Sequence, residues 1–89
     1  PFDPQMPLSF EHPDPDRAAK EAAVCALSED EFRKLFALTR VAASQKRASG
    51  DMKVLYGLTR GLKTLQRIGG ERGIVLQARP ITRASAKAT

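Results

Sequence analysis

Two consecutive stretches of this chain share one pattern: residues 31–51 read EFRKLFALTRVAASQKRASGD, and residues 51–71 read DMKVLYGLTRGLKTLQRIGGE. They align without a gap at an offset of 20 residues, and similarity at a fixed period is the signature of an internal repeat. The apolar residues have helical spacing and each copy ends in glycine, so each copy predicts a helix with its closing turn. Six positions are identical: Leu35, Leu38, Thr39, Arg40, Arg47 and Gly50 recur as Leu55, Leu58, Thr59, Arg60, Arg67 and Gly70.

Start and stop signals set the limits of these two helices. Ser28 and Glu31 have the spacing of a capping box, which predicts a helix start directly after Ser28. Gly50 suits the left-handed turn that closes a helix, and Asp51 can cap the next one. We expect that next helix to stop at Gly69-Gly70. The two helices, predicted at 29–48 and 52–68, then form an antiparallel helical hairpin across a short turn.

The chain before the hairpin is predicted to be an extended arm followed by a short helix. Five prolines within residues 1–15 prevent a helix and favour a polyproline-like backbone. An Asp-Pro-Asp run at residues 14–16 predicts a helix over residues 15–27. The arm either docks in a groove of its own domain or of a partner, or is a mobile tail. Its apolar side chains are Phe2, Met6, Leu8 and Phe10.

The end of the chain is predicted to be extended as well. Ile74-Val75-Leu76 is at most a short strand because Pro80 limits it, and the basic residues beyond are low in complexity. We expect neither end of the chain to join the core. The predicted division is an acidic Pro-rich arm at 1–14, a helical domain at 15–73 that holds both repeat units, and an extended segment with a basic tail at 74–89.

Length and composition are those of one small domain, which the three predicted helices make all-α. The chain has 89 residues, of which 42% are hydrophobic and only 6% aromatic, so the core must be thin. A thin core leaves apolar surface uncovered, and we therefore expect a homo-oligomer. No apolar run approaches the roughly 18 residues that a bilayer-spanning helix needs, which predicts a cytoplasmic protein without membrane contact.

One face of the repeated helix is apolar. In the second copy four leucines step by 3, 4 and 3 residues, which is the spacing of a helix-packing seam, and we expect Leu35 and Leu38 of the first copy to be buried against them. Gly57 and Gly61 interrupt the second helix at a cost of roughly 1 kcal/mol each relative to Ala. A close approach of another helix or a bound partner would explain them, and tolerated defects are the alternative. The predicted interface residues are Phe36, Leu55, Tyr56, Leu58, Leu62 and Leu65, and the first-copy equivalents of the seam are Leu35, Leu38, Ala42 and Gln45.

Opposite that seam each copy carries a basic ridge, because Arg33, Arg40 and Arg47 are spaced by seven residues and the second copy repeats this spacing. Charge is also divided along the chain, with eight acids and two bases in residues 1–31 but thirteen bases and two acids in residues 32–89. The ridge is a solvated face, a phosphate-contacting surface, or a partner of the chain's own acidic arm. The predicted nucleic-acid contacts are Arg33, Arg40, Arg47, Lys53, Arg60, Arg67, Lys63 and Arg72.

The residues needed for catalysis, metal binding or cofactor binding are not grouped in this sequence. His12 is the only histidine and Cys25 the only cysteine, so a catalytic Cys-His pair and the usual zinc sites are not indicated. The glycines at residues 69–73 follow a helix, whereas phosphate-binding loops lead into one. We therefore expect no enzyme, no metal and no cofactor, and we expect Cys25 to be a buried small side chain.

These observations predict a small oligomeric accessory protein that presents basic helix faces to the phosphate backbone of DNA or RNA. A hairpin with a basic face resembles the architecture of phage and plasmid DNA-handling proteins, and the likeness is one of architecture alone. The alternative is a non-catalytic adaptor whose hairpin groove or Pro-rich arm captures a protein partner, with the basic faces meeting an acidic protein surface.

Overall fold

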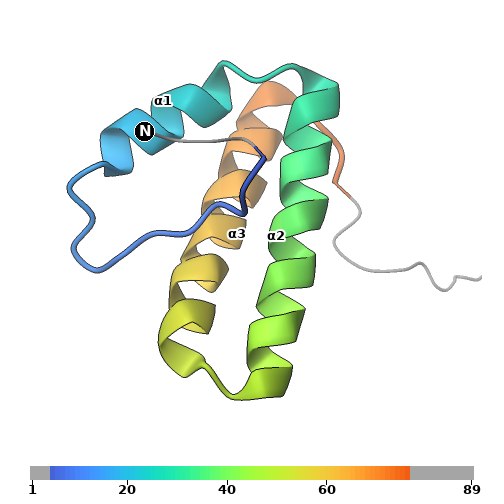
Figure 1. Cartoon of the computed structure of the whole chain (residues 1–89). Helices are drawn as coiled ribbons and strands as arrows, with labels where there is room; N and C mark the ends of the chain where they lie inside the picture. Colours follow the sequence, from blue (N-terminus) through green and yellow to red (C-terminus); the bar gives the residue numbers. More distant parts are fainter. Residues whose placement is uncertain (1–4, 77–89) are drawn as a thin grey trace, which may run out of the picture.

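The computed structural model describes residues 5–76, and within this range the chain forms three helices and no strand (Figure 1). Helix α1 spans Arg17–Cys25, α2 spans Glu29–Ser49 and α3 spans Met52–Arg72. The long helices α2 and α3 run antiparallel. Helix α1 packs against the part of α3 that lies far from the turn between α2 and α3 (Figure 1). The predicted all-α class and the helical hairpin are confirmed.

The caps of α2 are the ones that the sequence predicts. The Ser28 hydroxyl accepts a hydrogen bond from the Glu31 amide, and the Glu31 carboxylate accepts one from the Ser28 amide, both at 3.1 Å. At the other end Gly50 has a φ of 80°, which is left-handed. Its neighbour Asp51 then caps α3 by accepting a hydrogen bond from the Val54 amide. The turn of the hairpin is therefore encoded locally.

Helix α3 does not stop at Gly69-Gly70, so that prediction is wrong. It continues to Arg72, and Gly73 closes it with a φ of 73°. The amide of Ile74 donates to the Gly69 carbonyl at 2.8 Å. This is the hydrogen bond of a Schellman motif that joins residues five positions apart in the chain. Gly69 instead serves packing, because a Cβ there would lie only 3.2 Å from the Phe32 ring. Tertiary contact thus overrides the weak helix propensity of two adjacent glycines.

The apolar seam is confirmed on α3, whereas on α2 the prediction holds for Leu35, which is buried, and is wrong for Leu38. Leu55, Leu58 and Leu65 are buried and Leu62 is half-buried, whereas Leu38 retains 36% of its exposure. Because the two phenylalanines of α2 offer the largest apolar area, α2 turns them inward and leaves Leu38 and Gln45 outside. The buried residues of α2 are Phe32, Leu35, Phe36, Thr39 and Ala43.

The N-terminal arm docks on its own domain. Leu8 and Phe10 are 1% and 2% exposed and share one core cluster with residues of all three helices. The Leu8 amide donates to Thr39 Oγ1 at 3.0 Å, and the Phe10 amide donates to the Gly57 carbonyl at 3.2 Å. The sequence predicts that the arm either docks in a groove or is a mobile tail, and residues 8–10 are docked on their own domain. The expectation that neither end joins the core is wrong, since Ile74 is buried in the same cluster.

The two interior glycines of α3 form the seat of this arm. A Cβ on Gly61 would overlap the Leu8 carbonyl oxygen, and a Cβ on Gly57 would lie 2.8 Å from the Phe10 carbonyl oxygen. The glycines therefore permit a close approach, although the approaching element is the arm and not a helix. Cys25 also differs from its prediction, because it is exposed at the last residue of α1.

Candidate functional site

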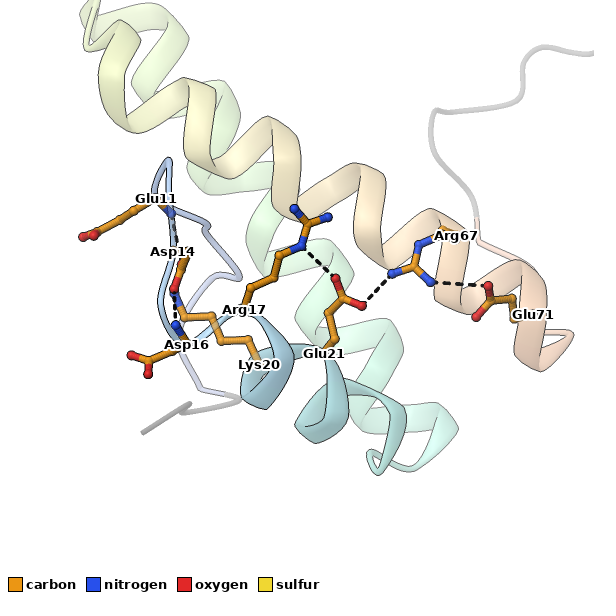
Figure 2. A network of polar contacts seen from close by, with 8 residues as sticks. All are labelled: Glu11, Asp14, Asp16, Arg17, Lys20, Glu21, Arg67 and Glu71. Atoms are coloured by element: carbon orange, nitrogen blue, oxygen red, sulfur yellow. Dashed lines mark hydrogen bonds and ion pairs between the residues drawn. The ribbon is translucent and has the colours of Figure 1, made fainter.

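A chain of ion pairs joins α1 to α3 (Figure 2). Arg17 Nε lies 3.1 Å from Glu21 Oε2, and Glu21 Oε1 lies 2.8 Å from Arg67 Nη2. Arg67 Nη1 in turn lies 3.3 Å from Glu71 Oε2. The hydrogen bond from Arg17, followed by that from Arg67, lowers the pKa of Glu21 although burial opposes the shift. Glu21 therefore stays ionised and fixes the positions of two guanidinium groups.

A second cluster fixes α1 to the arm. The Asp14 carboxylate accepts hydrogen bonds from Lys20 Nζ at 2.7 Å, from the Asp16 amide at 2.8 Å and from the Glu11 amide at 3.0 Å (Figure 2). The Lys20 hydrogen bond is the main reason why the pKa of Asp14 falls from 3.8 to about 2. Lys20 Nζ also donates to the Ser9 carbonyl at 2.9 Å. Because the arm is seated on α3, these bonds hold the start of α1 against α3 as well.

Four cationic side chains meet where α1 lies on α3. A surface pocket of about 240 Å³ is lined by Arg17, Arg60, Lys63, Thr64 and Arg67. The last four lie on α3 at intervals of three, one and three residues, which places them on one helix face. Arg17 comes from the first turn of α1. Every charged residue among 5–76 that lines the pocket is a cation, so the pocket is suited to an anion.

Two of these cations are not neutralised by the described part of the chain. Among residues 5–76, neither Arg60 nor Lys63 forms an ion pair with a carboxylate. The Arg60 guanidinium lies over the Tyr56 ring, 5.8 Å from its centre, and its Nη1 is 3.5 Å from the Tyr56 hydroxyl. Arg60 Nε is buried and has no hydrogen-bond acceptor within these residues. Arg60 therefore retains unused capacity to donate to an anion.

Only some residues of the predicted basic ridge line the pocket. Arg60, Lys63 and Arg67 lie together at the pocket, whereas Arg33 pairs with Glu29 at 2.7 Å and donates to the carbonyl of Val75. Residues 73–76 run toward the side of α2 that faces away from α1 (Figure 1), and Arg33, which contacts Val75 there, does not line the pocket. The remaining predicted contacts lie outside the pocket lining. The guanidinium groups of Arg40 and Arg72 lie over the rings of Phe36 and Phe32. Arg47 and Lys53 are exposed near the hairpin turn.

Arg17 completes the pocket but is not among the predicted contacts. It lies in the acidic part of the sequence and outside the repeat, so neither pattern points to it. Its spacing of four residues from Glu21 indicates a helical ion pair, and this was the only available signal. That Glu21 also reaches Arg67, 46 residues later, is a tertiary contact that helical spacing does not encode.

The pocket is lined mainly by hydrogen-bond donors. The lining residues from the described part of the chain offer guanidinium, ammonium and hydroxyl donors and include no carboxylate, histidine or thiol. Within residues 5–76 no group of three or more His, Cys, Asp or Glu residues is placed to hold a metal ion. None of the helices in that range is long and apolar enough to cross a membrane.

Comparisons of this chain with protein-family models, with curated proteins and with solved structures find no match.

Proposed function

We propose that this protein binds the phosphate backbone of nucleic acid through the face that α1 and α3 share. The observation that carries this proposal is the convergence of four cations from two helices on one pocket, to whose lining residues 5–76 contribute no carboxylate. Guanidinium and ammonium groups donate to phosphate oxygens and do not depend on base identity, so binding that is insensitive to sequence is expected. The net charge of +5 also favours association with a polyanion.

The contact surface in this proposal is smaller than the ridge that the sequence predicts. Arg33 is occupied by Glu29 and by the Val75 carbonyl, so a phosphate would have to displace these partners. Arg60 and Lys63 need give up no ion pair within residues 5–76. We therefore propose Arg60 and Lys63 as the main contacts, with Arg17 and Arg67 beside them.

Self-association belongs to the same proposal. One small face offers few phosphate contacts, and a homo-oligomer that presents several such faces gains affinity through multivalency. Leu38 and Val41 on the outer side of α2 are 36% and 55% exposed, and they supply apolar area for contact between copies. Neighbouring copies would then add their pockets along one nucleic acid.

We further infer that residues 31–51 and 51–71 arose by duplication. Two pairs of equivalent positions make the same contacts. Thr39 and Thr59 donate to the carbonyls of Leu35 and Leu55 at 2.8 and 2.9 Å. The guanidinium groups of Arg40 and Arg60 lie 6.0 and 5.8 Å from the ring centres of Phe36 and Tyr56. Shared contacts of this kind support a common origin beyond the similarity of sequence.

The adaptor alternative has weaker support. It requires either an open hairpin groove or a free Pro-rich arm, yet Leu8 and Phe10 fill the groove beside Gly57 and Gly61. A partner that uses the groove would first have to displace the arm and expose both apolar side chains to water.

The proposal is tested by fluorescence anisotropy with mixed-sequence DNA and RNA duplexes of roughly 30 base pairs at about 50 mM salt. The double variant Arg60→Glu/Lys63→Glu should bind at least about tenfold more weakly than wild type, because both main contacts are reversed in charge. Arg47→Glu/Lys53→Glu is the matched control: it makes the same change in net charge near the hairpin turn and should bind within about threefold of wild type.

Wild-type protein that binds neither duplex at high micromolar concentration would rule out the proposed function. Light scattering on the same samples checks the assembly, for which we expect a mass of at least twice the 9.7 kDa of one chain. A pure monomer would contradict the self-association.

A further inference from the structure

We propose that the pocket between α1 and α3 is a site for a phosphate monoester dianion, the group carried by the 5′ end of a phosphorylated strand and by small phosphorylated compounds. The inference rests on the proposed function in one respect, since it assigns the same pocket to phosphate. It goes further by naming which kind of phosphate the pocket prefers, a terminal group instead of an internal phosphodiester.

Charge balance is the first argument. Four cations line the pocket, and two of them, Arg17 and Arg67, are bound to Glu21, with Glu71 also on Arg67. Counting these two carboxylates leaves a surplus of two positive charges around the pocket. An internal phosphodiester brings one negative charge, whereas a phosphate monoester brings about −1.5 to −2 at neutral pH. The monoester therefore matches the surplus and the diester leaves part of it unbalanced.

Preorganisation is the second argument. Glu21 holds the guanidinium groups of Arg17 and Arg67 in fixed positions on the two sides of its carboxylate (Figure 2). Side chains that are ordered before binding lose less conformational entropy when the ligand arrives. Arg60 and Lys63 are the complementary pair, because neither has a carboxylate partner among residues 5–76 to surrender. Binding would thus combine two oriented cations with two uncommitted ones.

Donor supply is the third argument. A terminal phosphate has three free oxygens that accept hydrogen bonds, one more than an internal phosphodiester. The pocket offers three guanidinium groups, one ammonium group and the hydroxyl of Thr64. The buried Nε of Arg60 has no acceptor within the described residues, so an anion that draws this guanidinium toward it satisfies a donor and breaks no hydrogen bond at Nε.

Size is the fourth argument. At about 240 Å³ the pocket is smaller than the roughly 300–1,000 Å³ of typical sites for small organic ligands. Among residues 5–76 no aromatic side chain lines it for a base to stack on. The pocket is therefore suited to the phosphate group itself, with the rest of the ligand outside.

The test compares two single strands of the same total charge. One is about 12 nucleotides long with a 5′-phosphate, and the other is about two nucleotides longer with a 5′-hydroxyl group, since each added phosphodiester contributes one charge. Anisotropy of a 3′ label should show the phosphorylated strand binding at least about tenfold more tightly, because general attraction to the backbone is equal for both. Lys63→Gln and Arg60→Gln should each reduce this preference to about twofold or less, whereas Lys53→Gln, outside the pocket lining, should keep it.

A separate titration distinguishes the two sources of the group. Inorganic phosphate should shift the backbone amide resonance of Thr64, which lines the pocket and is present in both proteins, to saturation in the wild type and not in Arg60→Gln/Lys63→Gln. A saturable shift without any preference for the phosphorylated strand assigns the site to small phosphate compounds and still supports the inference. Circular dichroism of each variant must match wild type, and Lys63→Gln, an exposed substitution, is the variant on which the comparison relies if Arg60→Gln does not fold.

The inference and the proposed function fail in different ways. Equal binding of both strands with no saturable phosphate shift overturns the monoester site while the backbone-binding function stands. Absence of binding to any nucleic acid, together with a saturable phosphate shift that the double variant loses, overturns the proposed function and leaves the phosphate site in place. Absence of both overturns both.

Discussion

Gly61 determines where the N-terminal arm can lie, because the Leu8 carbonyl oxygen occupies the space that a Cβ would take. One turn earlier Gly57 provides the same clearance for Phe10, and the Gly57 carbonyl accepts the Phe10 amide. Each glycine in a helix interior costs roughly 1 kcal/mol relative to Ala. The burial of Leu8 and Phe10, at roughly 1.5–3 kcal/mol each, more than offsets that cost. Gly57 and Gly61 thus destabilise α3 as a helix but stabilise the folded chain.

Gly61→Ala should therefore detach the arm from α3. The added methyl group cannot coexist with the Leu8 carbonyl. Loss of the arm should destabilise the fold by about 2–5 kcal/mol, because exposing two large apolar side chains costs roughly 3–6 kcal/mol and alanine regains roughly 1 kcal/mol as the better helix former. Hydrogen exchange should accelerate at the Leu8 and Phe10 amides, whose acceptors are Thr39 Oγ1 and the Gly57 carbonyl. Gly70→Ala is the control, because a Cβ there meets nothing within 4 Å. Unchanged exchange at both amides in Gly61→Ala would refute the arm placement.

At the scale of the helices, Gly50 and Gly70 show how equivalent positions of a repeat acquire different roles. They align in sequence, yet Gly50 has a left-handed φ of 80° after α2, whereas Gly70 lies inside α3. The difference arises because α2 is followed at once by the turn of the hairpin, while α3 extends to Gly73 and brings Ile74 into the core. Position in the repeat alone does not determine the conformation.

This difference predicts opposite effects of the same substitution. Gly50→Ala should destabilise the protein by about 1 kcal/mol, because an L side chain strains a left-handed residue even where space is open. Gly70→Ala should stabilise it by roughly 0.5–1 kcal/mol, because alanine is the better helix former and nothing lies within 4 Å of its Cβ. Chemical denaturation of both variants beside wild type provides the measurement. A destabilised Gly70→Ala would contradict a helical Gly70.

How far the sequence predicts these elements depends on how local their determinants are. The capping box at Ser28 and the turn at Gly50 involve neighbours within a few residues, and both predictions hold. The end of α3 and the inner face of α2 depend on packing: Phe32 lies against Gly69, and turning Phe32 and Phe36 inward leaves Leu38 outside. Such contacts join residues far apart in sequence, and periodicity within one helix does not contain them.

The same distinction applies to the pocket at the scale of the whole molecule. Heptad spacing identifies Arg60 and Arg67 as neighbours on one helix face, which the structure bears out for the pocket lining. It cannot indicate that Arg17 faces them, because the placement of α1 depends on Glu21 reaching Arg67 and on the docked arm. The spacing also predicts Arg33 and Arg60 as equivalent phosphate contacts, although Arg33 forms an ion pair with Glu29. Tertiary contacts decide which cations form the site.

Ionised carboxylates hold the arm, α1 and α3 together, which predicts that the fold weakens in acid. Lys20 lowers the pKa of Asp14 from 3.8 to about 2, and the hydrogen bond from Arg17 followed by that from Arg67 lowers the pKa of Glu21. A carboxylate whose pKa is lower in the folded state stabilises the fold fully above its unfolded pKa, and this contribution is lost as the pH falls through the folded pKa. For Asp14 the loss should therefore occur as the pH falls from 3.8 to about 2.

Urea denaturation followed by circular dichroism from about pH 7 to about pH 2 measures this dependence. Asp14→Asn should be less stable than wild type at neutral pH and should lose less stability on acidification, so that the two profiles converge near the lower limit. The side-chain amide has a single acceptor oxygen, so it can accept from the Glu11 amide or from the Asp16 amide but not from both, and it cannot form the ion pair with Lys20. Glu11→Gln is the matched control, because the exposed Glu11 carboxylate forms no ion pair within residues 5–76, and it should retain the wild-type profile. Parallel profiles for Asp14→Asn and wild type would show that the Asp14–Lys20 pair does not hold the arm and α1 in place.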